Sequence, residues 1–173
     1  MNILPKFTPV KTFVFDVDGV LTDGSLLILG DGQMARTMNI KDGYALQLAI
    51  KKGFRVVVLS GASPSAVNER LNKLGVRDIF FDVLDKREKL LEYQQQYGLK
   101  HEEILFMGDD IPDLSAMQLV GLPCCPADAV VEIKQASVYI SPYIGGAGCV
   151  RDVIEKVLKL NGCWDLETDI AAT

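Results

Sequence analysis

The sequence predicts an α/β fold in which helices cover both faces of a doubly wound, mainly parallel sheet. Two observations lead to this expectation: short, nearly continuous apolar runs recur along the chain, and segments with helical apolar spacing separate them. Continuous apolar runs are typical of parallel strands, because helices bury both faces of such a sheet. The alternation predicts one three-layer domain over residues 1–173, a length within the usual range for a single domain.

Five apolar runs are expected to form the sheet, and one further segment is expected to form a β-hairpin. The expected strands are Thr12–Val17, Phe54–Ser60, Ile79–Val83, Ile104–Met107 and Val138–Ile140. The hairpin occupies about residues 24–40, where Gly30-Asp31-Gly32 separates Ser25–Leu29 from Met34–Asn39. Because it falls between the first strand and the first helix, we expect it to be an insertion in the domain.

Capping residues and glycines mark the expected helix ends. Two helices are expected over about residues 42–53 and 63–75, with Asp42 and Ser63 as their N-caps. The remaining expected helices are Lys86–Tyr97, Ile111–Leu119 and Cys149–Leu160. Residues 161–173 show little pattern and are predicted to form a C-terminal tail.

The composition argues against several classes of partner. The formal net charge of −5 disfavours nucleic acid, because binding a phosphate backbone requires clustered Lys and Arg. No apolar run reaches the roughly 18–20 residues that cross a bilayer, so no membrane partner is expected. The start of the sequence lacks the pattern of a signal peptide, which predicts a cytoplasmic protein. The four cysteines include no C-x-x-C pair, and we interpret them as reduced structural residues.

The strongest functional pattern is Asp16-Val17-Asp18-Gly19, which ends the first apolar strand. Residues two apart in an extended chain point the same way, so both carboxylates are expected at the carboxyl edge of the sheet. Two adjacent carboxylates repel each other unless a cation or a proton intervenes, and their oxygens suit Mg²⁺. The alternative is that Asp16 and Asp18 merely end a strand and form a turn, where Asp and Gly are common.

A second group of carboxylates follows the expected strand Ile104–Met107. The segment is Gly108-Asp109-Asp110-Ile111-Pro112-Asp113, at a second strand end. Helix capping near Pro112 explains Asp110 and Asp113 well. It explains Asp109 less well, because this residue lies between the strand and the cap, and we interpret Asp109 as a metal ligand.

Two further segments are expected to complete a site for a phosphate group. Ser60-Gly61 ends the expected strand Phe54–Ser60, where a hydroxyl and backbone N–H groups can hold phosphate oxygens. Lys86 begins a helix and can neutralise phosphate charge as a compact cation. Taken alone, Ser60-Gly61 is a weak signal because Ser-Gly is an ordinary turn, and Lys86 is better explained as a solvated surface lysine. The interpretation therefore depends on the order of all the segments.

That order is a strand with Asp-x-Asp, a strand with Ser, a Lys at a helix start, and a strand with Gly-Asp-Asp-x-x-Asp. It resembles the haloacid dehalogenase superfamily of phosphotransferases over about residues 12–155. The resemblance implies a phosphatase in which Asp16 is the nucleophile that forms an aspartyl-phosphate and Asp18 is the general acid and base. It implies Mg²⁺ held by Asp16, the backbone carbonyl of Asp18 and Asp109, phosphate held by Ser60, Gly61 and Lys86, and a metal site steadied by Asp110 and Asp113.

The chain has no room for the cap domain that most of this superfamily carries. The gap after the first motif holds only the hairpin and a helix, and the gap over residues 61–86 holds one helix and one strand. The capless pattern resembles the phosphatases of 3-deoxy-D-manno-octulosonate 8-phosphate (KDO 8-phosphate), on Asp16–Gly24, Asn39–Gly43, Val67–Arg70, Gly145–Gly148 and Arg151. This resemblance implies a sugar acid phosphate substrate, a role in lipopolysaccharide synthesis, and a homotetramer whose neighbouring subunits close each site.

Arg70, Lys41 and Asp42 are the expected substrate-binding residues by the same resemblance. Arg70 can bind a sugar carboxylate through its forked donors, although a solvated helix arginine is an equally good interpretation. The chain departs from the family pattern at Ala62 and Ala147, where that family often has arginine. A nine-carbon 2-keto-3-deoxy sugar acid 9-phosphate is therefore kept as an alternative substrate.

Two other classes of function remain as alternatives. A non-catalytic assembly module related to sugar-nucleotide synthetases is disfavoured because Asp16 and Asp18 are both present. A sugar phosphate mutase is disfavoured because mutases of this superfamily generally need a cap.

Overall fold

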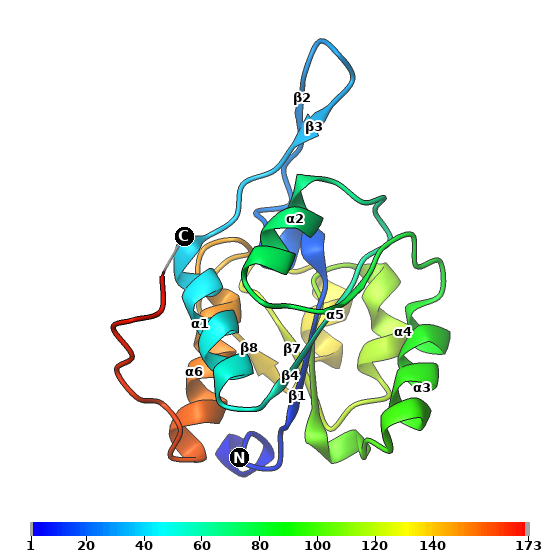
Figure 1. Cartoon of the computed structure of the whole chain (residues 1–173). Helices are drawn as coiled ribbons and strands as arrows, with labels where there is room; N and C mark the ends of the chain where they lie inside the picture. Colours follow the sequence, from blue (N-terminus) through cyan, green and yellow to red (C-terminus); the bar gives the residue numbers. More distant parts are fainter. Residues whose placement is uncertain (1, 172–173) are drawn as a thin grey trace.

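The computed structural model describes residues 2–171 and shows a six-stranded parallel sheet between two layers of helices (Figure 1). The strands, in their order across the sheet, are β5 (Asp78–Phe80), β4 (Arg55–Leu59), β1 (Thr12–Phe15), β6 (Ile104–Met107), β7 (Leu122–Cys125) and β8 (Tyr139–Ile140). Every neighbouring pair is parallel. The predicted doubly wound α/β fold is confirmed.

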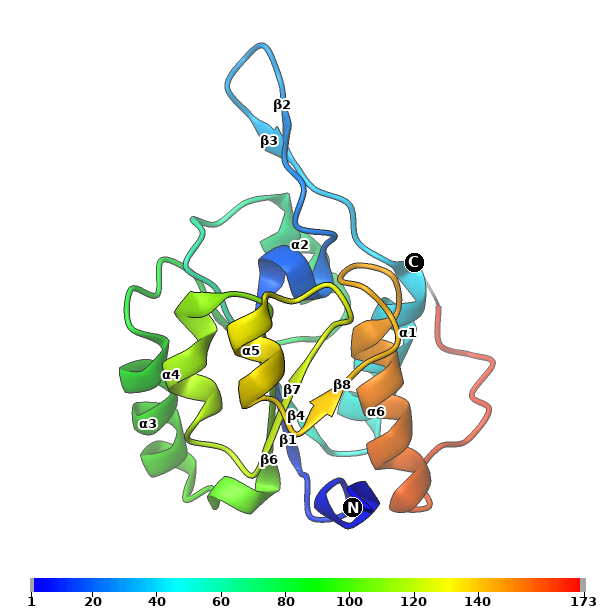
Figure 2. The ribbon, with the colours of Figure 1, turned by 180° about the vertical axis from the view of Figure 1, so that it is seen from behind.

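Helices bury both faces of the sheet, which explains why its strands are continuous apolar runs. One face is covered by α1 (Ile40–Lys51), α2 (Ala66–Lys73) and α6 (Cys149–Leu160), and the other by α3 (Lys86–Tyr97), α4 (Leu114–Met117) and α5 (Val131–Ala136), as Figure 2 shows from behind. Successive side chains of β1 alternate between these layers. Phe13 and Phe15 belong to the core beneath α1 and α6, whereas Val14 belongs to the core beneath α3 and α4.

One strand of the sheet and one α-helix were not expected from the sequence. Strand β7 contains Pro123, which has no N–H to donate and is normally a signal against an inner strand. Its carbonyl nevertheless accepts the Val138 N–H at 2.8 Å, next to β8. Helix α5 follows Val130, which offers no capping side chain, so no start signal marks it in the sequence.

Three expected helix starts need correction. Asn39, not Asp42, caps α1, because its side chain accepts the Lys41 N–H at 2.8 Å. Ser65, not Ser63, caps α2 by accepting the Val67 N–H at 3.3 Å. The helix expected over 111–119 is a 3₁₀ turn, Ile111–Asp113, followed by the short α4.

Asp42 lies in the first turn of α1 but acts on another helix. Its buried carboxylate accepts the Arg151 N–H at 2.8 Å, in the first turn of α6. The sequence could not show this contact, because it joins residues that are far apart along the chain. Asp42 therefore ties the packed pair of α1 and α6 together.

The inserted hairpin projects from the body of the domain (Figure 1). It consists of β2 (Leu27–Ile28) and β3 (Met34–Ala35), paired antiparallel, with an isolated bridge between Thr22 and Met38 at its base. Its side chains are apolar and exposed: Leu27 is 64% exposed and Ile28 is 70% exposed. An exposed apolar surface of this kind is typical of an interface.

The segment after α6 returns along α1 (Figure 1). Tyr44 donates its hydroxyl to the Glu167 carbonyl at 2.9 Å, and Lys51 and Lys52 both pair with the Glu167 carboxylate. Of the tail expected over 161–173, Ala172 and Thr173 lie outside the described residues. None of the helices within residues 2–171 has the length and apolar character that crossing a membrane requires.

Asp42 provides a test of the contact between α1 and α6. Burial raises the pKa of Asp42 to about 6, although the N–H groups of Arg151 and Gly148 oppose the shift. The folded protein thus keeps a proton that the unfolded chain releases, so this group costs stability as the pH rises from about 4 to about 6. Asp42→Asn keeps an acceptor and removes the charge. We expect its free energy of unfolding, relative to wild type, to rise by on the order of 1–3 kcal/mol between about pH 4 and pH 7.

Urea denaturation of both proteins across this pH range measures the difference. All other titrating groups are shared, so their contributions cancel. A difference that stays constant with pH would show that the Asp42 carboxylate is not held in a buried, charge-disfavouring environment.

Candidate active site

The candidate site lies where three central strands end. Strand β1 lies between β4 and β6, with Phe15 in register with both Val58 and Met107. The residues that follow these strands therefore meet at one edge of the sheet. A pocket of about 320 Å³ opens there. The predicted residues that line it are Asp16, Asp18, Ser60, Gly61, Lys86, Asp109, Asp110 and Asp113.

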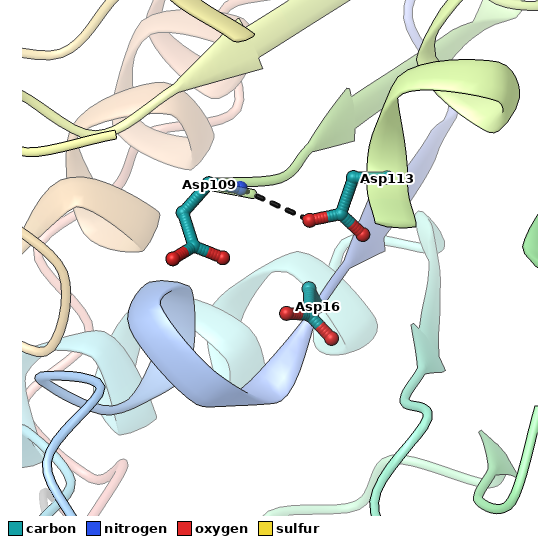
Figure 3. A group of neighbouring side chains, drawn as sticks. All are labelled: Asp16, Asp109 and Asp113. Atoms are coloured by element: carbon teal, nitrogen blue, oxygen red, sulfur yellow. Dashed lines mark hydrogen bonds between the residues drawn. The ribbon is translucent and has the colours of Figure 1, made fainter. Parts of the chain in front are cut away.

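Three carboxylates converge at the base of the pocket (Figure 3). Oxygen atoms of Asp16, Asp109 and Asp113 all lie within 4.8 Å of one another. The Asp109 N–H donates to Asp113 Oδ2 at 3.0 Å, which fixes two of the three groups relative to each other. From the sequence, Asp113 is expected only to steady the metal site, whereas the structure places its carboxylate inside this cluster.

Burial and mutual repulsion raise the pKa values of this cluster. Burial and then the Asp113 charge raise the pKa of Asp16 to about 6, against the opposing effect of Lys86. Burial and then the charges of Asp16 and Asp113 raise the pKa of Asp109 to about 7. Among the described residues, the buried Oδ1 of Asp109 also has no hydrogen-bond partner. A divalent cation with oxygen ligands fits this donor set, because it would pair that atom and offset the repulsion.

Lys86 is the cation already present in the pocket. Asp85 caps α3 and so places Lys86 as the first residue of that helix. Its buried ammonium donates to Asp16 Oδ1 at 2.7 Å and to Asp113 Oδ1 at 2.6 Å. Burial acts to lower the pKa of Lys86, but the two carboxylates outweigh it and raise the pKa. An ammonium has three N–H donors, so one remains for a ligand.

Ser60 is held by its backbone with its hydroxyl toward the pocket. Its N–H donates to the Phe80 carbonyl at 2.9 Å, and its carbonyl accepts the Val83 N–H at 3.0 Å. The hydroxyl oxygen accepts the Ala62 N–H at 3.2 Å, so the hydroxyl proton is available to a ligand.

Glycines allow the turn after Asp16 to approach both the carboxylates and a second loop. Gly19 has φ +88°, and a Cβ there would collide with the Asp109 carboxylate. A Cβ on Gly145 would collide with the Gly19 carbonyl, and the Gly146 N–H donates to the Val20 carbonyl at 3.0 Å. The glycine-rich loop before α6 therefore packs directly on the turn that contains Asp18.

The carboxylate of Asp18 is paired with a residue that sequence reasoning missed. Arg36, just after β3, donates to both of its oxygens. The available signal was that Arg36 is the one basic residue in the inserted segment 24–40, directly after the first carboxylate motif.

The three expected substrate-binding residues lie in different places. Arg70 lines a groove of about 270 Å³ between the hairpin and α2, together with Arg36, and its Nη2 is buried with no partner in the described chain. Lys41 lines another groove beside α6, with Arg151. Asp42 is buried against α6. Lys41 and Asp42 are thus not brought to the pocket of Asp16.

Comparison with known proteins places the chain in a family. A family model described as haloacid dehalogenase-like hydrolase matches residues 32–121. The 3-deoxy-D-manno-octulosonate 8-phosphate phosphatase KdsC of Haemophilus influenzae is 30% identical over 157 residues, which are 91% of this chain and 87% of that protein. The chain belongs to the haloacid dehalogenase-like hydrolases. It is a phosphatase of this family.

Solved structures of such phosphatases have the same fold. The KDO 8-phosphate phosphatase of Moraxella catarrhalis, solved with a magnesium ion, a phosphate ion and KDO, superposes with a TM-score of 0.88 at 30% identity, covering 91% of each chain. The cobalt-bound enzyme of Haemophilus influenzae superposes with a TM-score of 0.86 at 30% identity, covering 91% of this chain and 92% of that one. The pocket at the end of β1, β4 and β6 is thus part of a haloacid dehalogenase-like phosphatase fold.

Metal binding should stabilise the protein in a pH-dependent way. Because the pKa values of Asp16 and Asp109 are raised, the metal-free folded state binds protons that the unfolded chain releases, and stability falls from about pH 4 to pH 7. Mg²⁺ binds the ionised cluster, so the rise in Tm on adding Mg²⁺ should grow between about pH 5.5 and pH 8. At about ten times its Kd, a cation adds about 1.4 kcal/mol, or about 3–6 °C for a chain of this length.

Asp109→Asn should remove most of this Mg²⁺ response and should raise the metal-free Tm at pH 8, because it removes an unpaired charge. The matched control is Asp165→Asn, which breaks an ion pair with Lys52 at the C-terminal segment. A full Mg²⁺ response in Asp109→Asn, measured by calorimetry, would place the metal elsewhere.

Proposed function

We propose that this protein is a Mg²⁺-dependent phosphatase that hydrolyses KDO 8-phosphate to KDO and phosphate, a step of lipopolysaccharide synthesis. The observation that supports it most is the buried Asp16 carboxylate, bonded to Lys86 within a cluster of three carboxylates. The magnesium, phosphate and KDO bound in the Moraxella catarrhalis enzyme support the choice of metal and substrate.

Asp16 is assigned as the nucleophile. Its N–H donates to the Met107 carbonyl at 3.1 Å, so its backbone is fixed to the end of β6. With a pKa of about 6, its carboxylate is mostly ionised at neutral pH. One oxygen attacks phosphorus, the bond from phosphorus to the sugar oxygen breaks, and the sugar oxygen takes a proton from Asp18. Water then attacks the phosphorus of the aspartyl-phosphate and gives a proton to Asp18; the bond between phosphorus and the Asp16 oxygen breaks, which releases phosphate and restores both residues.

Mg²⁺ is assigned to Asp16, the backbone carbonyl of Asp18 and Asp109, with Asp113 adjoining. When bound, it supplies positive charge that lets an anionic carboxylate approach an anionic phosphate. Asp110 caps the turn at Ile111, accepting its N–H at 2.8 Å, and Asp113 accepts N–H groups from Asp109 and Asp110. Both therefore hold the segment that presents Asp109.

Lys86, Ser60 and Gly61 are assigned to the transferred phosphoryl group. The remaining N–H of Lys86 and the hydroxyl of Ser60 can each donate to a phosphate oxygen. These donors come from elements that are fixed by backbone bonds, so they are oriented before the substrate arrives.

Arg70 is assigned to the carboxylate of the sugar acid. Arg70 lines a groove that also contains Arg36, the residue paired with Asp18, and its Nη2 is buried without a partner in the described chain, close to Gly43 of α1. A buried unpaired donor is costly, and a carboxylate accepts two donors of the guanidinium fork. Lys41 and Asp42 lie outside this groove, so we assign them no substrate contact within one chain.

A homotetramer in the cytoplasm completes the proposal. Residues 2–171 place no cap domain above the catalytic pocket, and the apolar hairpin is exposed on the single chain. Burying that hairpin against neighbouring subunits would remove apolar surface from water and could close each site. The cytoplasmic location expected from the sequence stays a prediction.

Phosphate release from a panel of sugar phosphates tests the function. The wild type should release phosphate from KDO 8-phosphate with the highest kcat/KM, ahead of nine-carbon 2-keto-3-deoxy sugar acid 9-phosphates and neutral sugar phosphates. Chelating Mg²⁺ should stop turnover, and Asp16→Asn should reduce kcat by about 10³-fold or more in protein whose cooperative thermal transition shows that it is folded. Turnover retained by Asp16→Asn would exclude the aspartyl-phosphate route. A preference for nine-carbon substrates would exclude the assigned substrate alone.

Sedimentation tests the assembly. Wild type at micromolar concentration should sediment as a tetramer, and Ile28→Asp should dissociate it, because a charge in a buried apolar interface is strongly disfavoured. Leu91→Asp is the control, since Leu91 is similarly apolar and exposed but lies on α3. A monomeric wild type would contradict the assembly and leave the assignment of Asp16 intact.

A further inference from the structure

The carboxylate of Asp18 is held by one residue of the hairpin. Arg36 donates from Nε to Asp18 Oδ1 at 2.6 Å and from Nη2 to Asp18 Oδ2 at 3.2 Å. No other group within residues 2–171 makes a hydrogen bond to this carboxylate. Two parallel charge-assisted bonds fix the orientation of a carboxylate as well as its position.

Without this contact, Asp18 would be poorly restrained. It lies at a sharp change of direction, with ψ 118° followed by Gly19 at φ +88°, and its side chain is 36% exposed. Arg36 is the more buried partner: its side chain is only 10% exposed, and its Nη1 donates to the Met34 carbonyl at 3.5 Å. Ordering a side chain before reaction removes an entropic cost from the transition state.

We propose that Arg36 is a positioning residue for the proton transfers of Asp18. The inference rests on the role proposed above for Asp18 and adds the residue that orients it. Proton transfer requires heavy atoms about 2.6–3.2 Å apart, and a misplacement of about 1 Å can cost about 10²-fold in rate. Because Arg36 belongs to the inserted hairpin, the placement of the hairpin sets the geometry of the general acid.

The leaving group provides a readout that a purely structural role would not affect. A sugar alkoxide is a poor leaving group and needs a proton as its bond to phosphorus breaks, whereas 4-nitrophenolate leaves without one. The parameter kcat/KM covers the steps up to release of the leaving group. Arg36→Met should therefore lower kcat/KM for KDO 8-phosphate by about 10–100-fold and for 4-nitrophenyl phosphate by less than about threefold.

A double-mutant cycle separates action through Asp18 from direct contact with the substrate. Asp18→Asn alone should show the same dependence on the leaving group. In the Asp18→Asn background, Arg36→Met should cause little further loss, because the group that it orients is already inactive. Arg36→Lys, which keeps the charge without the fork, should retain intermediate activity. Arg77→Met is the matched control, because this arginine is exposed and its side chain makes, within residues 2–171, a single hydrogen bond, to the Asn72 carbonyl.

Each outcome has a distinct meaning. If Asp18→Asn shows no dependence on the leaving group, the proposed role of Asp18 is wrong. If Asp18→Asn does show this dependence, two results would overturn the inference about Arg36 and leave the proposed function standing. In the first, Arg36→Met affects both substrates equally. In the second, Arg36→Met adds its full loss to that of Asp18→Asn. Sedimentation and Tm of each variant show whether a loss reflects assembly or folding, and Arg36→Lys keeps the test valid if Arg36→Met does not fold.

Discussion

The site depends on the repulsion among three carboxylates that the fold forces into one pocket. Asp16, Asp109 and Asp113 approach within 4.8 Å, and Lys86 is the one cation bonded to them within residues 2–171. Burial disfavours the charged forms of Asp16 and Asp109, and one ammonium cannot balance three negative charges, so both pKa values are raised in the metal-free site. Burial and repulsion destabilise the ionised carboxylates of the folded chain. They therefore give the pocket affinity for a divalent cation, and for the transition state that such a cation stabilises.

The sheet determines which residues take part in this repulsion. Since β1 lies between β4 and β6, any residue directly after these strands is carried to the same edge. Position relative to a strand end is readable from the sequence, so Asp16, Ser60 and Asp109 could be predicted. Lys86 could be predicted too, because the start of α3 is marked by a capping residue and its end by Gly98.

Contacts between distant segments could not be predicted in this way. Asp42 has the sequence of a helix cap, but it caps α6, because the packing of α1 on α6 brings a free N–H of Arg151 nearer than its own helix end. Arg36 pairs with Asp18 only because the hairpin folds back over the first motif. Strand β7 was missed because Pro123 argues locally against a strand that its neighbours impose. In each case tertiary packing overrides a local signal.

The residues proposed for the chemical step are positioned by the strand or helix that carries them. Those proposed to select the substrate are positioned by contacts between distant segments. The residues proposed as nucleophile and phosphate ligands follow individual strands or begin a helix, so the sheet fixes their geometry. Arg36, proposed to orient Asp18, and Arg70, proposed to bind the sugar carboxylate, come from the hairpin and α2 and line one groove between them. Ala62 lies between the two regions, lining both the catalytic pocket and the space beneath the hairpin. The small side chain of Ala62 thus adjoins both the proposed phosphate site and the space beside the hairpin, so the departure from the family's arginine falls where these two spaces meet.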